Sequence, residues 1–136
     1  MNIAGFNFEN TTSTFIIAEI SANHNQDIEV AKKTISEIKK TGANCVKFQT
    51  YTPDTLTIDS DKDDFMIKGS IWEGKSLYNL YQQAYTPWEW HEELFNFAKN
   101  EGLICFSSPF DRSSVDLLES LNTPAYKIAS FEINDI

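Results

Sequence analysis

The stretch Phe15-Ile-Ile-Ala-Glu-Ile-Ser21 decides the fold, because it is short, β-branched and almost continuously apolar. Such a run is typical of a strand that is buried on both faces of a parallel sheet. Further runs of this kind occupy residues 44–51, 103–108 and 126–130. The sequence therefore predicts about four parallel strands.

Helical patterns fill the gaps between these runs. Apolar residues recur at helical spacing over 27–41, and Gly42 follows as a C-terminal cap. A second helix is predicted over 86–100, with Thr86 as its cap and Pro87 in the first helical position. Strands alternating with helices predict a parallel sheet with right-handed crossovers, either an open doubly wound sheet or a barrel.

A third helix is predicted over 113–121, where Ser113 and Asp116 form a typical helix start. Between the second strand and the second helix lies an insertion, residues 52–85, far longer than an ordinary βα loop. Apolar residues from Leu77 to Ala84 have helical spacing. We interpret the insertion as a substrate-covering loop that contains a short helix.

Composition narrows the class of protein. The 136 residues carry a formal net charge of −9, which argues against nucleic acid or a membrane surface as a partner. No apolar stretch approaches the ~20 residues of a membrane span, and no secretory leader is evident, so we expect a cytoplasmic protein. Cys45 and Cys105 are expected to be reduced core residues, and the cysteines and histidines have no metal-ligand spacing.

Three charged residues, Glu19, Lys47 and Lys127, lie late in otherwise apolar strands. The carboxyl ends of parallel strands line the ligand site in barrels and open sheets, so the three predict an anion-binding site. The alternative is a structural ion-pair network in which Glu19 neutralises a lysine. Gln49 is two residues from Lys47 and should share its face of the strand.

Other polar residues are less specific. Ser107 and Ser108 end their strand where hydroxyl and N–H groups could accept a phosphate, although serine is also ordinary turn chemistry there. His24, just after the first strand, suits proton transfer or substrate binding, or is a plain helix-entry histidine. His91 is interpreted as structural.

Four segments together resemble the sialic-acid synthase family. They are 15–24 (FIIAEISANH), 46–50 (VKFQT), 106–110 (FSSPF) and 126–132 (YKIASFE), and they occur in the family's order through nearly the whole chain. The resemblance implies an enzyme that condenses phosphoenolpyruvate with an N-acetylated amino sugar, using a divalent metal, to give a nine-carbon acidic sugar and phosphate.

The resemblance also implies roles for individual residues. Those that would bind phosphoenolpyruvate are Lys47, Ser108, Lys127 and Ser130, and those that would face the sugar are Glu19, Gln49 and Glu132. Glu19, Lys47 and Lys127 are the expected catalytic residues. Perfect alternation would place Lys127 and Ser130 on opposite faces, so the strand is expected to end or bulge near Ala129.

The implied fold is the N-terminal half of a (β/α)8 TIM barrel. A whole barrel takes ~250 residues, so residues 1–136 are expected to be a truncated synthase domain. The C-terminal half of the barrel, with the histidines that bind Mn²⁺ or Mg²⁺, and an antifreeze-like domain would be absent. We expect the fragment alone to be inactive and the full-length protein to be a homodimer.

Residues 21–24 and 72–91 look like the pseudaminate branch of the family. The expected sugar is therefore 2,4-diacetamido-2,4,6-trideoxy-L-altrose, and the expected product is pseudaminic acid. Three alternatives remain open. They are an N-acetylneuraminate or legionaminate synthase, a Schiff-base aldolase that uses Lys47 or Lys127 as nucleophile, and a non-catalytic half barrel that binds an anion.

Overall fold

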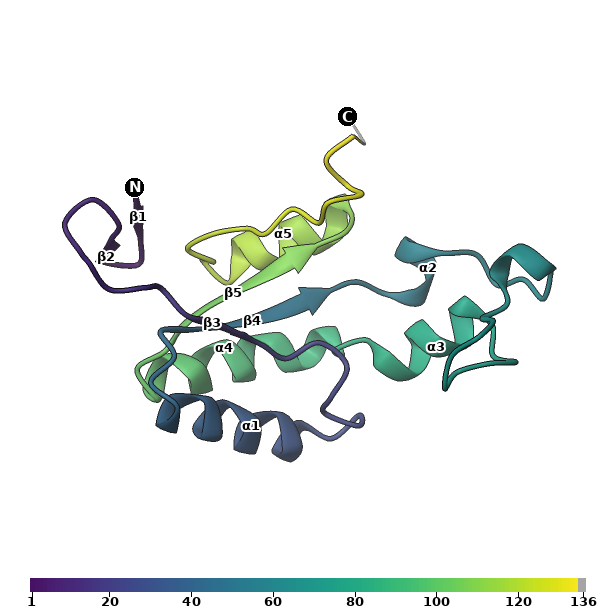
Figure 1. Cartoon of the computed structure of the whole chain (residues 1–136), viewed down its shortest axis with the longest axis horizontal. Helices are drawn as coiled ribbons and strands as arrows, with labels where there is room; N and C mark the ends of the chain where they lie inside the picture. Colours follow the sequence, from purple (N-terminus) through teal and green to yellow (C-terminus); the bar gives the residue numbers. More distant parts are fainter. Residues whose placement is uncertain (135–136) are drawn as a thin grey trace.

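The computed structural model describes residues 1–134 and contains one parallel sheet. Its strands are β3 (Ile17–Glu19), β4 (Cys45–Thr50) and β5 (Ile104–Pro109), which neighbour one another in chain order (Figure 1). The strand order does not reverse among the described residues, as it would at the switch point of a doubly wound sheet. The arrangement is that of part of a barrel wall.

Helices precede or follow each strand of the sheet, and the insertion extends beyond the carboxyl ends of β4 and β5 (Figure 1). A small antiparallel pair, β1 and β2, comes before the sheet. The bounds are β1 (Asn2–Ile3), β2 (Phe6–Asn7), α1 (Ile28–Lys40), α2 (Pro53–Leu56), η1 (Asp63–Phe65), α3 (Leu77–Ala84), η2 (Trp88–Trp90), α4 (His91–Asn100) and α5 (Arg112–Ser120).

The hydrophobic core lies between one face of the sheet and the helices α1 and α4. Val46 and Phe48 of β4 pack with Ile35 of α1 and Leu94 of α4. Because side chains alternate along a strand, Lys47 must lie on the opposite face. We call that opposite face the inner face of the sheet.

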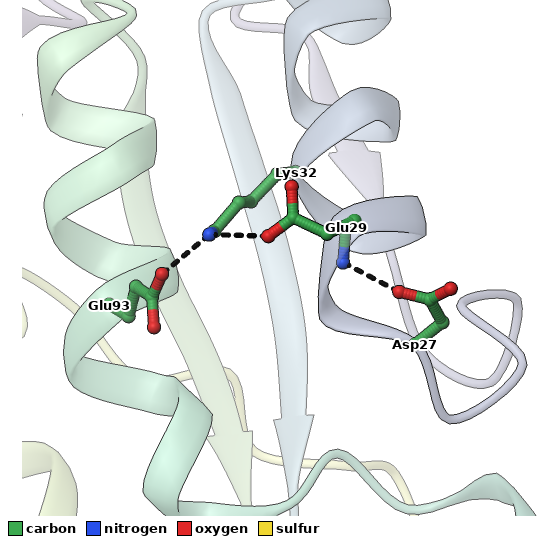
Figure 2. Close-up of polar contacts among 4 residues, drawn as sticks. All are labelled: Asp27, Glu29, Lys32 and Glu93. Carbon is green, nitrogen blue, oxygen red and sulfur yellow. Dashed lines mark hydrogen bonds and ion pairs between the residues drawn. The ribbon is translucent and has the colours of Figure 1, made fainter.

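Lys32 links α1 to α4 at the surface. Its Nζ lies 2.8 Å from Glu29 Oε1 and 2.5 Å from Glu93 Oε1, and Asp27 caps α1 by accepting from the Glu29 N–H at 2.8 Å (Figure 2). Hydrogen bonds to the two carboxylates raise the pKa of Lys32. Surface ion pairs contribute little, so apolar packing of the two helices is the main contact.

Two predicted helix starts are wrong. Thr86 does not cap a helix, because the 3₁₀ turn η2 intervenes after Pro87 and α4 begins only at His91. The cap of α5 is Asp111, whose carboxylate accepts from the N–H groups of Ser113 and Ser114. The Thr86 hydroxyl contacts His24 instead of a helix N–H group. At α5 the carboxylate of Asp111, and not the hydroxyl of Ser113, accepts from the first N–H groups.

Other predictions are confirmed. Helix α1 ends before Gly42, which has φ +83°, a conformation that favours glycine. Helix α3 occupies Leu77–Ala84 within the insertion.

The predicted fourth strand is reduced to a single parallel bridge. Tyr126 pairs with Ser107 of β5, and the Lys127 N–H donates to the Ser107 carbonyl at 3.2 Å. Beyond this point the chain makes no further ladder among the described residues, and a turn begins at Ser130. The bridge therefore ends at Tyr126, three residues before Ala129, where the sequence predicted that the strand would end or bulge.

Candidate active site

An ion pair marks the inner face of the sheet. Glu19 and Lys47 are opposite each other in the register of β3 and β4, and Lys47 Nζ lies 2.9 Å from Glu19 Oε1. The Lys47 side chain is 9% exposed and that of Glu19 is 43% exposed. One side of the pair is therefore buried and the other reaches water.

Two neutral side chains extend this face toward the carboxyl ends of the strands. Gln49 and Ser108 are partners in the register of β4 and β5. The Ser108 hydroxyl is buried and has no hydrogen-bond partner within residues 1–134. A buried hydroxyl without a partner is costly, and a ligand that accepts or donates a hydrogen bond would relieve that cost.

The remaining predicted site residues follow the Tyr126 bridge. Lys127 and Ser130 are exposed, and Glu132 is half-buried in the turn that begins at Ser130. Their backbone runs beside β5, because the Lys127 N–H bonds the Ser107 carbonyl. The structure therefore brings Glu19, Lys47, Gln49 and Ser108 together, with Lys127, Ser130 and Glu132 in the adjoining segment.

A buried hydrogen-bond chain supports the strand ends from the helix side. His91 Nδ1 lies 3.1 Å from the Pro87 carbonyl, and its Nε2 lies 2.8 Å from Thr50 Oγ1. Thr50 Oγ1 in turn lies 2.7 Å from Ser107 Oγ. Since a carbonyl only accepts, Nδ1 carries the proton, Thr50 donates to Nε2 and Ser107 donates to Thr50. Burial lowers the pKa of His91, which favours this neutral ring.

His24 holds the loop that follows β3. The Gln26 N–H donates to His24 Nδ1 at 3.2 Å, so Nε2 carries the proton and donates to Thr86 Oγ1 at 3.3 Å. The ring is 1% exposed, and burial lowers its pKa. His24 therefore joins the loop after β3 to Thr86, which lies just before η2.

A cavity of about 550 Å³ opens between the loop after β3 and α3. Gln49 lines it, so it adjoins the inner face. Its lining includes three aromatic residues, Tyr51, Trp72 and Tyr81. Two other hollows, of about 500 and 550 Å³, lie beside α4 and do not include any of the predicted site residues.

Other expected sites can be placed as well. Among the described residues no three histidine, cysteine or acidic side chains gather as a metal site. Both cysteines are buried and unbridged, and burial raises the pKa of Cys45 to about 12, so neither resembles a reactive thiol. No helix in the described part is long and apolar enough to cross a membrane.

Sequence reasoning missed some parts of this site. The residue pattern treated Ser107 and Ser108 alike, and only the family resemblance singled out Ser108; the strand pleat directs Ser107 to Thr50 and Ser108 to the inner face. Sequence reasoning gave no role to Thr50 or to the aromatic residues that line the cavity. The alternation of side chains along β5 was a signal that could have separated the two serines.

Comparisons with known proteins identify relatives of this chain. Residues 34–136 match the model of the NeuB family. The chain is 54% identical to pseudaminic acid synthase of Campylobacter jejuni over 129 residues, which are 95% of this chain and 38% of that protein. It is 55% identical to pseudaminic acid synthase of Helicobacter pylori over 121 residues, 89% of this chain and 36% of that protein.

A solved structure gives the same answer for the fold. The N-acetylneuraminic acid synthetase of Leptospira borgpetersenii, crystallised with citrate, superposes with a TM-score of 0.72 at 26% identity. The match covers 89% of this chain and 38% of that one. The chain thus spans little more than a third of the length of the relatives it matches.

Proposed function

This chain belongs to the NeuB family, and on that premise we propose that the full-length protein is a pseudaminic acid synthase. It would condense phosphoenolpyruvate with 2,4-diacetamido-2,4,6-trideoxy-L-altrose to give pseudaminic acid and phosphate. The choice of sugar is supported by the identity of 54% and 55% to two proteins of that name.

One observation carries the proposal: a buried lysine and an unpartnered buried hydroxyl occupy one face at the carboxyl ends of parallel strands. An ammonium and a free hydroxyl are suitable donors for phosphate and carboxylate oxygens. We assign phosphoenolpyruvate to Lys47, Ser108, Lys127 and Ser130, and the sugar to Glu19, Gln49 and Glu132.

In the proposed reaction carbon 3 of phosphoenolpyruvate attacks the sugar aldehyde, and water adds at carbon 2. Phosphate then leaves carbon 2. Lys47 and Lys127 would stabilise the anionic groups throughout, and the contact with Lys47 would be strong because that side chain is buried. Glu19, beside Lys47 and partly exposed, would accept and return a proton.

The described residues do not fit a metal, so no step is assigned to one. We propose that Mn²⁺ or Mg²⁺ is bound by other residues of the full-length protein, that this protein is a homodimer and that it works in the cytoplasm.

The test is an assay of the full-length protein with phosphoenolpyruvate, Mn²⁺ and the diacetamido sugar. We expect one phosphate released per nine-carbon acid formed, and a preference for this sugar over N-acetylmannosamine. A preference for N-acetylmannosamine, or for the legionaminate precursor, would replace the assigned substrate by the alternative.

Borohydride trapping separates the synthase from an aldolase on the same barrel. A Schiff base requires a neutral amine, whereas Lys47 lies against a carboxylate. We expect no reduced adduct of lysine with substrate. A stable adduct on Lys47 or Lys127 would refute the phosphate-binding role, and a protein without turnover that still binds phosphoenolpyruvate would favour the non-catalytic alternative.

A further inference from the structure

We infer that the cavity between the loop after β3 and α3 selects the acetamido-bearing, deoxygenated end of the sugar, with Trp72 as its main specificity determinant. The inference rests on the proposed function, because it assigns one part of that function's sugar to one part of the site.

First, the cavity lies next to the inner face of the sheet. Gln49 lines the cavity and is also the register partner of Ser108 on the inner face. A sugar whose reacting end lies beside Lys47 and Ser108 therefore has its remaining length directed toward the cavity. The volume of about 550 Å³ is within the range of small-molecule sites.

The second argument is the chemistry of the wall. Its polar groups include the amides of Asn25, Gln26 and Gln49, its rings include Tyr51 and Trp72, and no ionisable amine, guanidinium or carboxylate lines it. Such a wall suits a neutral ligand with methyl and amide groups and gives no cation for phosphate. The diacetamido trideoxy sugar has two acetamido groups and a methyl group, whereas N-acetylmannosamine has hydroxyls at two of these positions.

The third argument is that the wall at Trp72 is held in place. Residues 66 and 76 form an antiparallel bridge, and the Ile67 N–H donates to the Lys75 carbonyl at 3.0 Å. Lys75 Nζ lies 5.1 Å from the centroid of the Trp72 ring, a cation–π contact. Trp72 thus lies on the turn of a closed hairpin.

The opposite wall is tied to α3. Gln26 Nε2 donates to the Tyr85 carbonyl at 2.6 Å and to the Gln83 carbonyl at 3.2 Å. The Gln83 side chain accepts from Lys75 Nζ at 2.8 Å, which joins α3 to the hairpin. The side-chain amides of Asn25 and Gln49 also line the cavity and can hydrogen-bond a ligand there.

The test compares two sugars in the full-length protein at saturating phosphoenolpyruvate. Trp72→Ala should raise KM for the diacetamido sugar and reduce its preference over N-acetylmannosamine by about tenfold or more. Ala22→Leu, which adds bulk to another part of the wall, should act in the same direction. KM for phosphoenolpyruvate should stay unchanged in both.

Ile71→Ala is the matched control, because Ile71 precedes Trp72 in the same turn, is 92% exposed and does not line the cavity. It should leave both sugars unaffected. If Trp72→Ala and Ala22→Leu preserve the sugar preference while keeping the wild-type melting temperature, the inference is wrong.

Failure of the proposed function can be recognised separately. If the wild-type protein releases no phosphate with either sugar, binding of the diacetamido sugar alone is measured by calorimetry. Binding to the wild type and Ile71→Ala, but at least tenfold weaker binding to Trp72→Ala, supports the cavity without the reaction. Equal binding to all three, or no binding to any, overturns it.

Discussion

Lys47 and Glu19 differ in how well each would be solvated without the other. The Lys47 side chain is 9% exposed and that of Glu19 is 43% exposed. Glu19→Gln should therefore leave a buried unpaired ammonium and destabilise the fold by roughly 2–4 kcal/mol. Lys47→Met leaves a carboxylate that water can reach, and should cost less than about 1 kcal/mol.

Urea unfolding of both variants and of the double variant measures this asymmetry. The double variant should be close to Lys47→Met, because the buried ammonium is gone in both. Equal losses in the two single variants would contradict the assignment of burial to Lys47.

Replacing Lys127 should change activity without changing stability. It is exposed and has no ion-pair partner among the described residues. Lys127→Ala in the full-length protein should weaken use of phosphoenolpyruvate by about thirty- to a thousandfold, roughly 2–4 kcal/mol, while sugar binding changes little. Steady-state kinetics and thermal unfolding are measured together, and a lower melting temperature with a normal KM for phosphoenolpyruvate would assign Lys127 a structural role.

At this scale the sequence predicted which residues share a face but not which hydroxyl would be free. Lys47 and Gln49 were assigned to one face by alternation along their strand, and Glu19 was placed by its position late in the first strand; both are local properties. Within residues 1–134 the Ser108 hydroxyl has no partner, which depends on every group packed around it. Such surroundings cannot be read from one segment.

The cap of α5 shows how one element begins. Asp111 accepts from the N–H groups of Ser113 and Ser114, so Asp111→Ala should destabilise the fold by about 1 kcal/mol. Ser113→Ala is the matched change and should cost a few tenths of that, since its N–H keeps its acceptor. Chemical denaturation measures the loss of stability in each variant. A larger loss for Ser113→Ala would show that Ser113 is the helix cap, as the sequence pattern predicted.

The hydrogen bonds that run from the Pro87 carbonyl through His91 and Thr50 to Ser107 link α4 to the ends of β4 and β5. Because His91 is buried, they predict that stability depends on pH. Burial lowers the pKa of His91 and of His24 in the folded protein, so the unfolded chain binds protons first. Stability should be full above the unfolded pKa of about 6.5 and should fall as pH drops below it toward the lower folded value.

Thermal unfolding between pH 7.5 and 5.5 measures this slope. His91→Gln should melt lower at pH 7.5, because a buried partner is changed, yet show a shallower dependence on pH. His24→Gln measures how much the His24 ring contributes to the same pH dependence. A wild-type slope in both variants would show that neither histidine is responsible.

Element boundaries were predicted well where a local signal decides them and poorly where a distant partner does. Gly42 ends α1 through its own conformation. Thr86 has the sequence of a cap, but its hydroxyl contacts His24, which lies more than sixty residues earlier. The strand predicted after residue 125 is only a bridge, because β5 alone gives it a hydrogen-bonding neighbour within the described residues.

The whole molecule leaves apolar side chains in water. Among them are Ile16, Ile17, Ile128 and Ile133. We predict that the 136-residue chain self-associates at micromolar concentration, since exposed apolar groups and open strand edges favour contact between copies.

Sedimentation velocity should show species larger than a monomer, and Ile128→Ser with Ile133→Ser should reduce them. Ile58→Ser, an exposed isoleucine of the insertion, is the control and should have little effect. A monomer that unfolds cooperatively would contradict the prediction.

The insertion between β4 and η2 contributes no side chain to the hydrophobic core cluster described above. Substitutions at its cavity-lining positions therefore remove no packing from that core, which weakens the usual link between a new activity and a loss of stability. Under the proposed function, sugar preference can change by substitution at these positions while the sheet stays the same. A library randomised only at the cavity-lining positions Trp72, Leu80 and Tyr81 should contain mostly folded proteins, and directed evolution of sugar preference is best begun there.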